Sequence, residues 1–239
     1  MVHPDSANKK FRFILASGSP RRRMLLEHLG LRFDVRIKQT SEDFPPALSG
    51  AAIPEFLCLE KAKPFLKDLK PKDLLITADT IVRINGRVLN KPGNREEAIA
   101  MLSELSGKMH EVFTAFCLTS NKRQITHSVR SAVTFRRLDP WLIQNYLDAC
   151  SPYDKAGSYG AQDFMAGERN ACSPEENAFI KTIGCSALGS DCYSVPAMNG
   201  KMKFDGIERI EGSYFNVMGF PVVEFWQKLE KFAVGEESE

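Results

Sequence analysis

The sequence lacks any long apolar run, and this excludes a membrane-spanning protein. No stretch approaches the roughly 20 consecutive apolar residues that a helix needs to cross a bilayer, although 43% of the 239 residues are hydrophobic. The segment 1–10 is polar, ends in two lysines and has no apolar stretch of the kind found in secretion signals. We therefore expect a cytoplasmic protein with no membrane association, whose chain begins in a loose, disordered tail over 1–10.

An excess of one charge is also missing, as are clustered cysteines and the common nucleotide-binding motifs. Lys and Arg number 32 against 30 Asp and Glu, so the formal net charge is only +2. Specific nucleic-acid binding is therefore not expected, and any phosphate site has to come from local Arg and Lys clusters. The six cysteines are scattered without a CxxC pair, which favours reduced thiols over a zinc site. The absence of GxxxxGK[ST] and GxGxxG disfavours a kinase, a P-loop NTPase and a dinucleotide enzyme.

Strands and helices alternate along the chain, with hairpins among them. Apolar runs and turn signals predict strands over 11–16, 31–37, 74–78, 111–118 and 124–135, a hairpin over 80–89, and helices over 20–29, 51–69, 94–105, 139–146 and 220–232. Interleaved elements of this kind are typical of an α/β fold with a mixed sheet flanked by helices.

One segment does not fit this alternation. Residues 163–205 are rich in Gly, Ser, Asn and Cys and show no sustained period, which predicts an inserted loop that the fold can lose without unfolding. We thus expect a single domain over 11–233, interrupted by this loop and followed by a tail over 234–239.

Polar residues that could carry chemistry stand at the ends of predicted strands. Ser17, Ser19, Arg21 and Arg22 lie between a strand and a helix, where free backbone N–H groups, hydroxyls and guanidinium groups suit a polyphosphate. A capped helix with a solvated basic edge explains the same residues. Asp79 and Thr80 follow the strand over 74–78. Asp79 there could activate a water or bind a metal, or it could merely open the next hairpin.

Three further residues and one segment are ambiguous when each is taken alone. Glu42, Lys61 and Lys91 are compatible with ordinary solvated side chains. The segment 153–162, YDKAGSYGAQ, has small residues that allow close approach to a ligand, but it also suits a surface loop. His110 begins a predicted strand and is interpreted as structural.

These pieces, in this order, resemble the Maf family. The matching stretches are LASGSPRR (15–22), ADTIV (78–82), NKP (90–92), MLSELSG (101–107), HEV (110–112), DKAGSYGAQ (154–162) and NVMGFP (216–221), which together span most of the chain. The resemblance implies a mixed sheet in two lobes around a deep cleft, a homodimer, and hydrolysis of a nucleoside triphosphate to its monophosphate and pyrophosphate with a divalent metal. Arg21, Thr80 and Gln162 resemble the branch that acts on dTTP and UTP.

The resemblance also suggests a role for each candidate residue. Asp79 is the general base, and Glu42 and Asp79 bind Mg²⁺ or Mn²⁺. Catalysis is supported by Lys61 and Lys91, and substrate is bound by Ser17, Ser19, Arg21, Arg22, Thr80, Asp154, Lys155 and Gln162. The family is also linked to control of cell division, so a nucleotide-sensing protein that acts through a partner is the alternative.

Overall fold

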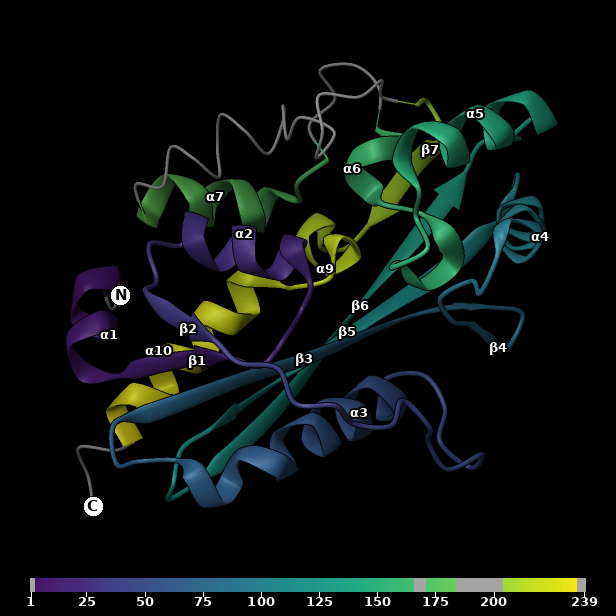
Figure 1. Cartoon of the computed structure of the whole chain (residues 1–239). Coiled ribbons are helices and arrows are strands. Elements are labelled where there is room, and N and C mark those ends of the chain that lie inside the picture. The colour runs from purple at the N-terminus through teal and green to yellow at the C-terminus, as the bar shows by residue number, and fades with distance from the viewer. Residues whose placement is uncertain (1–2, 166–170, 184–203, 236–239) are drawn as a thin grey trace.

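The protein is described by a computed structural model over residues 3–165, 171–183 and 204–235. Its centre is a mixed seven-stranded sheet in the order β2-β1-β3-β5-β6-β7, with β4 paired to β3 (Figure 1). The strands are β1 (Arg12–Leu15), β2 (Phe33–Val35), β3 (Asp73–Ile84), β4 (Arg87–Leu89), β5 (Met109–Thr119), β6 (Gln124–Phe135) and β7 (Ile207–Glu211). β1 is parallel to both β2 and β3, and the other pairs are antiparallel. The predicted α/β class is confirmed.

Helices cover both faces of this sheet (Figure 1). They are α1 (Pro4–Lys10), α2 (Pro20–His28), α3 (Ala52–Ala62) with the 3₁₀ turn η1 (Lys63–Asp68), α4 (Arg95–Leu105), α5 (Pro140–Cys150), η2 (Ala156–Ser158), α6 (Ala161–Phe164), α7 (Pro174–Ile183), α9 (Tyr214–Met218) and α10 (Val222–Gly235). No helix in the described ranges is long and apolar enough for a membrane span.

Successive side chains of β3 show which helices cover which face, because side chains alternate along a strand. The Thr77 hydroxyl donates to the Cys58 carbonyl of α3 at 2.7 Å, and Ile81 packs with Ile53 of the same helix. Val82, one position along from Ile81, belongs instead to the large core that contains residues of α2, α9 and α10. α2 and α3 therefore lie on opposite faces of the sheet, as Figure 1 shows.

This arrangement leaves a notch at one end of β1. β1 ends at Leu15, which pairs with Ile76, whereas β3 continues and pairs with β4 only from Val82 onward. The chain leaves β1 through α2 to reach β2 on one side, then crosses through α3 to β3 on the other. Ligands of open α/β sheets bind where strand order switches in this way. The fold thus provides a ligand site beside the middle of β3.

Local turn and cap residues account for several element boundaries. Pro20 is in the first turn of α2, and Gly30 follows that helix with φ of +73°. Asn85 and Gly86 have φ of 50° and 80°, as a type I′ turn requires. The Asn94 side chain accepts from the Glu97 amide at the start of α4. Turn and cap chemistry was therefore readable from sequence.

The predicted loose tail over 1–10 is wrong for the residues that the structure describes. Pro4–Lys10 forms α1, in which Ala7 is buried. Lys10 Nζ donates to the Ala233 carbonyl, and the ring of Phe11 contacts that of Phe232 with centroids 6.2 Å apart. The sequence gives no periodic signal in so short a polar helix, and packing against α10 stabilises it.

A second correction concerns the strand that was predicted to end at Ala78. β3 runs on to Ile84, so Asp79 and Thr80 lie inside a strand rather than at its end. β5 pairs with β3 from Leu75 to Arg83, and its ladder outweighs the local turn tendency of Asp and Thr.

The predicted inserted loop over 163–205 also contains ordered structure. Phe164 ends α6 in the core, and α7 buries Phe179 and Ile180. The sequence signal was available: Ser173 and Glu176 form a capping box, in which the Ser173 hydroxyl accepts from the Glu176 amide and Glu176 accepts from the Ser173 amide. Residues 166–170 and 184–203 lie outside the described part, as do 236–239 of the predicted tail, whereas Val234 and Gly235 belong to α10.

Candidate active site

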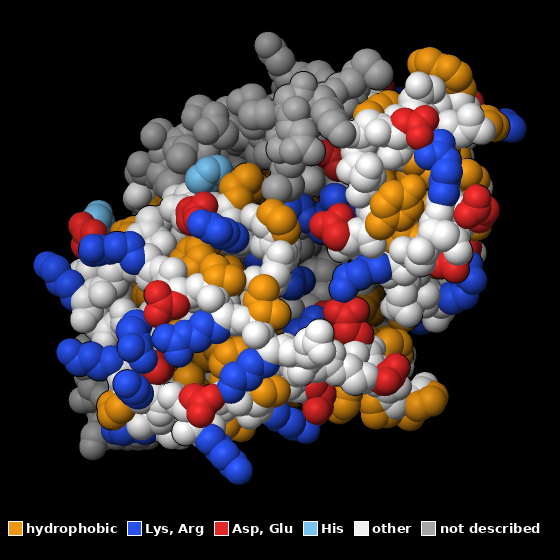
Figure 2. Space-filling model, viewed as in Figure 1, with side chains coloured by type: hydrophobic (Ala, Val, Ile, Leu, Met, Phe, Trp, Pro, Cys, Tyr) orange, Lys and Arg blue, Asp and Glu red, His pale blue; other side chains and the backbone are white. Residues whose placement is uncertain are grey.

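A cavity of about 420 Å³ lies in the notch beside β3. Its walls come from the β1–α2 loop with the first turn of α2 (16–22), the β2–α3 loop (37–42), the middle of β3, and the end of α9 at 217–219. Acidic and basic side chains meet around a hollow on this face of the molecule (Figure 2). All of the predicted site residues line the cavity except Lys155 and Gln162. The fold therefore brings together residues that the sequence separates by more than a hundred positions.

The β1–α2 loop presents an anion-binding helix start to the cavity. Ser17 Oγ accepts from the Ser19 amide at 3.2 Å, which folds the loop back on itself. Ser19 is the N-cap of α2, and within the described chain its side chain caps none of that helix's amides. A helix N-terminus with available N–H groups attracts negative charge. This end of the loop is suited to a phosphate group.

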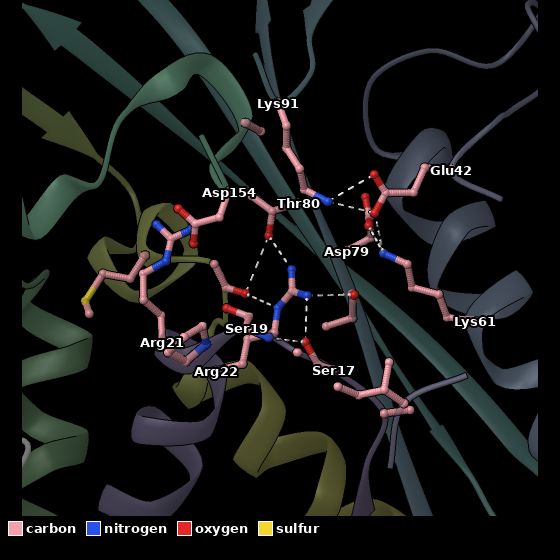
Figure 3. A pocket seen from close by; sticks show the side chains of 18 of the residues that line it. Ser17, Ser19, Arg21, Arg22, Glu42, Lys61, Asp79, Thr80, Lys91 and Asp154 are labelled. Atoms are coloured by element: carbon pink, nitrogen blue, oxygen red, sulfur yellow. Dashed lines mark hydrogen bonds and ion pairs between the residues drawn. The ribbon is translucent and has the colours of Figure 1, made fainter. Parts of the chain in front are cut away.

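Arg22 connects the segments that form the floor of the cavity (Figure 3). Its guanidinium donates to the carbonyls of Ala78 and Gly219, each at 2.9 Å, to Thr80 Oγ1 at 2.9 Å and to Ser17 Oγ at 3.3 Å. These bonds connect the β1–α2 loop, β3 and α9. Arg22 was predicted to bind phosphate, but its donors already have protein acceptors. In this geometry it holds the floor of the cavity in place, and we call these four bonds the Arg22 clamp.

Thr80 takes part in the same network and was predicted to contact substrate. Its hydroxyl lies 2.9 Å from that of Thr114, and Thr114 donates to the Asn216 carbonyl, also at 2.9 Å. Thr80 lines the cavity, but its hydroxyl is engaged with Arg22 and Thr114. The polar floor is therefore internally bonded from β3 and β5 to α9.

Two carboxylates and two lysines form the charged end of the cavity (Figure 3). The Lys61 ammonium on α3 pairs with Asp79 and lies 3.5 Å from Glu42 Oε1. Lys91 Nζ bonds both Glu42 oxygens, at 2.8 and 3.0 Å. Asp79 is only 7% exposed, whereas Glu42 and Lys91 are exposed at the mouth. Partial burial on its own raises the pKa of Glu42, but Lys91 and Lys61 outweigh it and bring that pKa below its usual value.

The charged end fits the metal that the resemblance implies. Asp79 and Glu42 converge on one ammonium group, which shows that their oxygens face a common point of positive charge. Mg²⁺ and Mn²⁺ prefer oxygen ligands, and Mg²⁺ is commonly held by one or two carboxylates together with substrate phosphates. No group of three or more His, Cys, Asp or Glu forms a metal cluster within the described ranges. A metal held here would thus depend on the substrate for its remaining ligands.

The opposite end of the cavity is formed by Arg21, Asp154 and Tyr159, and we call it the buried end because Tyr159 is buried there, although Asp154 is exposed. Arg21 points toward Asp154 (Figure 3), and Asp154 Oδ1 accepts from Lys155 Nζ at 2.6 Å. Burial lowers the pKa of Arg21, and the charge of Asp154 acts in the opposite direction. Lys155 lies behind Asp154, buried and outside the cavity lining. We conclude that Lys155 orients Asp154 in this structure.

Gln162 is the most deeply buried of the predicted substrate-binding residues. Its side chain is 2% exposed, and neither amide atom has a hydrogen-bond partner among the described residues. An unpaired buried amide costs free energy, about 1–3 kcal/mol. Gln162 follows the turn at Gly160, whose amide donates to the Tyr146 hydroxyl at 3.0 Å. Gln162 does not line the cavity, but it lies three residues after Tyr159, which does.

Sequence reasoning missed part of the wall. Tyr159 lines the cavity, and its hydroxyl lies 2.7 Å from His110 Nε2, so the predicted structural role of His110 has a specific partner. Val217, Met218 and Gly219 of the α9 end also line it. These residues lay within the matched motifs, but apolar and glycine residues carry no chemical signal that assigns them to a site.

Known proteins similar to this chain agree on one family. A family model described as Maf-like protein matches residues 12–169. Proteins named dTTP/UTP pyrophosphatase from Bacteroides thetaiotaomicron and Parabacteroides distasonis are each 37% identical, over 93% and 94% of this chain and 96% and 97% of their own lengths. One from Porphyromonas gingivalis is 35% identical over 94% of this chain and 96% of its own.

A solved nucleoside-triphosphatase / dITP/XTP pyrophosphatase from Mycobacterium abscessus is 15% identical with a TM-score of 0.35, over 54% of this chain and 76% of that one. That similarity is too slight to add to the description of the fold. The extent of the family match and the identity to whole relatives decide the assignment: this chain belongs to the Maf family.

Proposed function

We propose that this protein hydrolyses nucleoside triphosphates between the α and β phosphates, and that dTTP and UTP are its preferred substrates. The products are the nucleoside monophosphate and pyrophosphate. The observation that carries the proposal is the charged end, where Asp79, Lys61, Glu42 and Lys91 gather beside the start of α2. Simple nucleotide binding does not need a buried carboxylate next to a phosphate site. The relatives' name supports the same activity and does not favour the alternative, a nucleotide sensor in cell division control.

Asp79 is the residue that we assign to the attacking water. Its carboxylate is nearly buried, it is fixed inside β3, and Lys61 holds one oxygen in place. Water oxygen forms a bond to the α-phosphorus, the bond from that phosphorus to the bridging oxygen breaks, and pyrophosphate leaves. Asp79 accepts the proton that the water loses. A general base of this kind contributes typically about 10²–10⁴-fold in rate.

The remaining residues of the charged end offset the growing negative charge. Lys61 and Lys91 are cations on either side of Glu42, and the amides at the start of α2 add dipoles. Phosphoryl transfer depends chiefly on such positioning and electrostatic stabilisation. Glu42 and Asp79 would hold Mg²⁺ or Mn²⁺, which when bound supplies further neutralisation of phosphate charge. Ser17 and Ser19 add hydroxyl donors along the β1–α2 loop.

The buried end is assigned to the base. A Gln amide both donates and accepts, which matches the adjacent N–H and carbonyl groups of uracil and thymine. Gln162 has both of these functions unpaired among the described residues, and Arg21 Nε is likewise without a partner there. Thr80 contributes by fixing Arg22 in the floor. A site that leaves its own polar groups unpaired with a wrong base can discriminate strongly.

The test is a panel of dTTP, UTP, CTP, dGTP and 7-methyl-GTP with Mg²⁺ and with Mn²⁺, in which monophosphate, pyrophosphate and orthophosphate are measured separately. We expect pyrophosphate release, with the highest kcat/KM for dTTP and UTP. Preference for CTP or a purine contradicts the base assignment, and orthophosphate as product contradicts the chemistry. Tight binding without turnover supports the sensor instead. The expected homodimer rests on the resemblance alone and the expected cytoplasmic location on the composition of the sequence; light scattering of the purified protein checks the first.

A further inference from the structure

Glu176 is a buried carboxylate outside the cavity that caps two helices at once. Oε2 accepts from the Ser173 amide at 2.7 Å, which closes the capping box of α7, and from the Tyr214 amide at 3.1 Å. Oε1 accepts from the Ser213 hydroxyl at 2.7 Å and from the Phe215 amide at 3.0 Å. The side chain is fully bonded although it is only 1% exposed. One residue of the segment over 163–205 therefore joins α7 to the start of α9.

Burial makes this arrangement unusual for an ordinary capping box. Desolvation raises the pKa of Glu176, and its hydrogen bonds to Ser213 and to the amides act against that rise. Its recorded partners within the described part of the chain are hydroxyl and amide donors, none of them a cation. Hydrogen bonds to a charged group contribute about 1.5–3 kcal/mol each. The start of α9 thus depends on Glu176 as the acceptor for the Ser213 hydroxyl and the Phe215 amide.

The other end of α9 forms part of the cavity. Val217, Met218 and Gly219 line it, and the Gly219 carbonyl accepts from Arg22 Nε at 2.9 Å. α9 has only five residues, so its two ends cannot move independently. A shift at the start of the helix is transmitted directly to the wall and to the Arg22 clamp.

We propose that Glu176 is a positioning residue of the active site, which acts through α9 to hold the cavity wall at 217–219 and the Arg22 clamp. Its role in catalysis rests on the proposed function; its role in fixing α9 does not. α7, which lies inside the segment predicted to be a dispensable loop, is then part of the binding site's support. α9 has other anchors, since Asn216 Nδ2 donates to the Val112 carbonyl at 3.1 Å and to Ser131 Oγ at 2.8 Å. The expected effect of losing Glu176 is therefore a displaced wall and weaker nucleotide binding, not loss of the fold.

The test compares three variants of the full-length protein. Glu176→Gln retains one oxygen, which is enough for the capping box of α7, because Glu and Gln both serve there. It replaces the other acceptor by an NH₂ group that faces donors. Ser173→Ala weakens the capping box and leaves the α9 bonds in place. Glu175→Gln removes a neighbouring, exposed negative charge as the matched control.

Two measurements distinguish a failure of this inference from a failure of the proposed function. Hydrogen exchange of the amides over 214–219 is expected to be about tenfold faster in Glu176→Gln, as loss of one charge-assisted bond predicts, and unchanged in the other two variants. KM for dTTP is expected to rise about tenfold while kcat stays within about twofold. A purely structural defect lowers the active fraction, so it reduces kcat and leaves KM alone.

Unchanged exchange over 214–219 in Glu176→Gln, or faster exchange with KM unaltered in an active enzyme, overturns the inference. If the wild type turns over no nucleoside triphosphate, the proposed function fails, and the exchange data with the Kd of a non-hydrolysable dUTP analogue decide the inference alone. Should Glu176→Gln not fold, Glu176→Asp replaces it with the same expected pattern, because Asp also serves in a capping box but its shorter side chain draws the carboxylate away from the donors of 213–215.

Discussion

The two ends of the cavity differ in how their polar groups are bonded. At the charged end, the carboxylates of Asp79 and Glu42 and the ammonium groups of Lys61 and Lys91 neutralise one another in the absence of substrate. Near the buried end in sequence, three residues after Tyr159 of the cavity wall, Gln162 does not itself line the cavity and has both amide atoms unpaired among the described residues. Under the proposed function, the charged end exchanges protein partners for phosphate, whereas Gln162 gains hydrogen-bond partners from the base.

This difference indicates where rate and where selectivity originate. Ion pairs at a solvent-accessible mouth can rearrange at little cost, because exposed pairs contribute only about 0–1 kcal/mol. A buried unpaired amide is costly, and only a ligand with matching groups relieves that cost. We therefore expect changes at the charged end to alter kcat and changes at the buried end to alter the ranking of substrates.

The largest expected effect is at Asp79. Asp79→Asn keeps the size of the side chain but cannot accept a proton, so kcat is expected to fall by about 10²–10⁴-fold. Asp43→Asn is the control: Asp43 is an exposed carboxylate next to Glu42, bonded to Ser41 at 2.6 Å. A folded Asp79→Asn enzyme with kcat within a few-fold of wild type would remove Asp79 from the chemistry.

The next effect concerns the buried end. Gln162→Leu removes both hydrogen-bonding groups at similar volume, and the ratio of kcat/KM for UTP to that for CTP is expected to fall about 10–100-fold. Gln39→Leu, on the loop that carries Glu42, changes the same residue type at the charged end and should leave the ratio unaltered. Equal losses for both substrates would show that Gln162 does not read the base.

A smaller effect tests whether water is excluded from the side chain of His110, next to the buried end. Burial lowers the pKa of His110 to about 3, whereas an unfolded histidine titrates near 6.5. Between these values the unfolded chain binds a proton that the folded protein does not. His110 therefore lowers stability as pH falls from about 6.5 toward 3, by up to about 1.4 kcal/mol per pH unit.

His110→Gln is expected to flatten the stability–pH slope by about 1 kcal/mol per unit in that window, measured by urea unfolding at several pH values. The carboxylates contribute equally to both proteins, so the difference isolates His110. Identical slopes would mean that water reaches His110, which lies behind Tyr159 of the cavity wall.

Much of the fold could be predicted from local chemistry. Pro20 and Gly30 bound α2, Asn85-Gly86 makes its turn, and Asn94 caps α4, because each effect acts within a few residues. The extension of β3 through Asp79 could not be predicted, since pairing with β5 determines it. α7 was missed although the Ser173–Glu176 capping box is a local signal. The Gly- and Ser-rich composition around this capping box favoured the prediction of a loop instead.

The sequence predicted which residues form the candidate site, but not which hydrogen bonds they make. Motif order identified Ser17, Asp79 and Lys91, whereas Glu42 and Lys61 lie outside the matched stretches and were given a role only with the resemblance; the fold brings all five to one cavity. The sequence could not show that Arg22 uses its donors on carbonyls. It also could not show that Lys155 lies behind Asp154, because both facts depend on side-chain packing between distant elements.

The central claim is that the charged end directs water to the α-phosphorus. Hydrolysis of dTTP in H₂¹⁸O with mass analysis of both products tests it most directly. The account predicts one ¹⁸O atom in the monophosphate and none in the pyrophosphate. Label in the pyrophosphate, which means attack on the β-phosphorus, or release of labelled orthophosphate would contradict it.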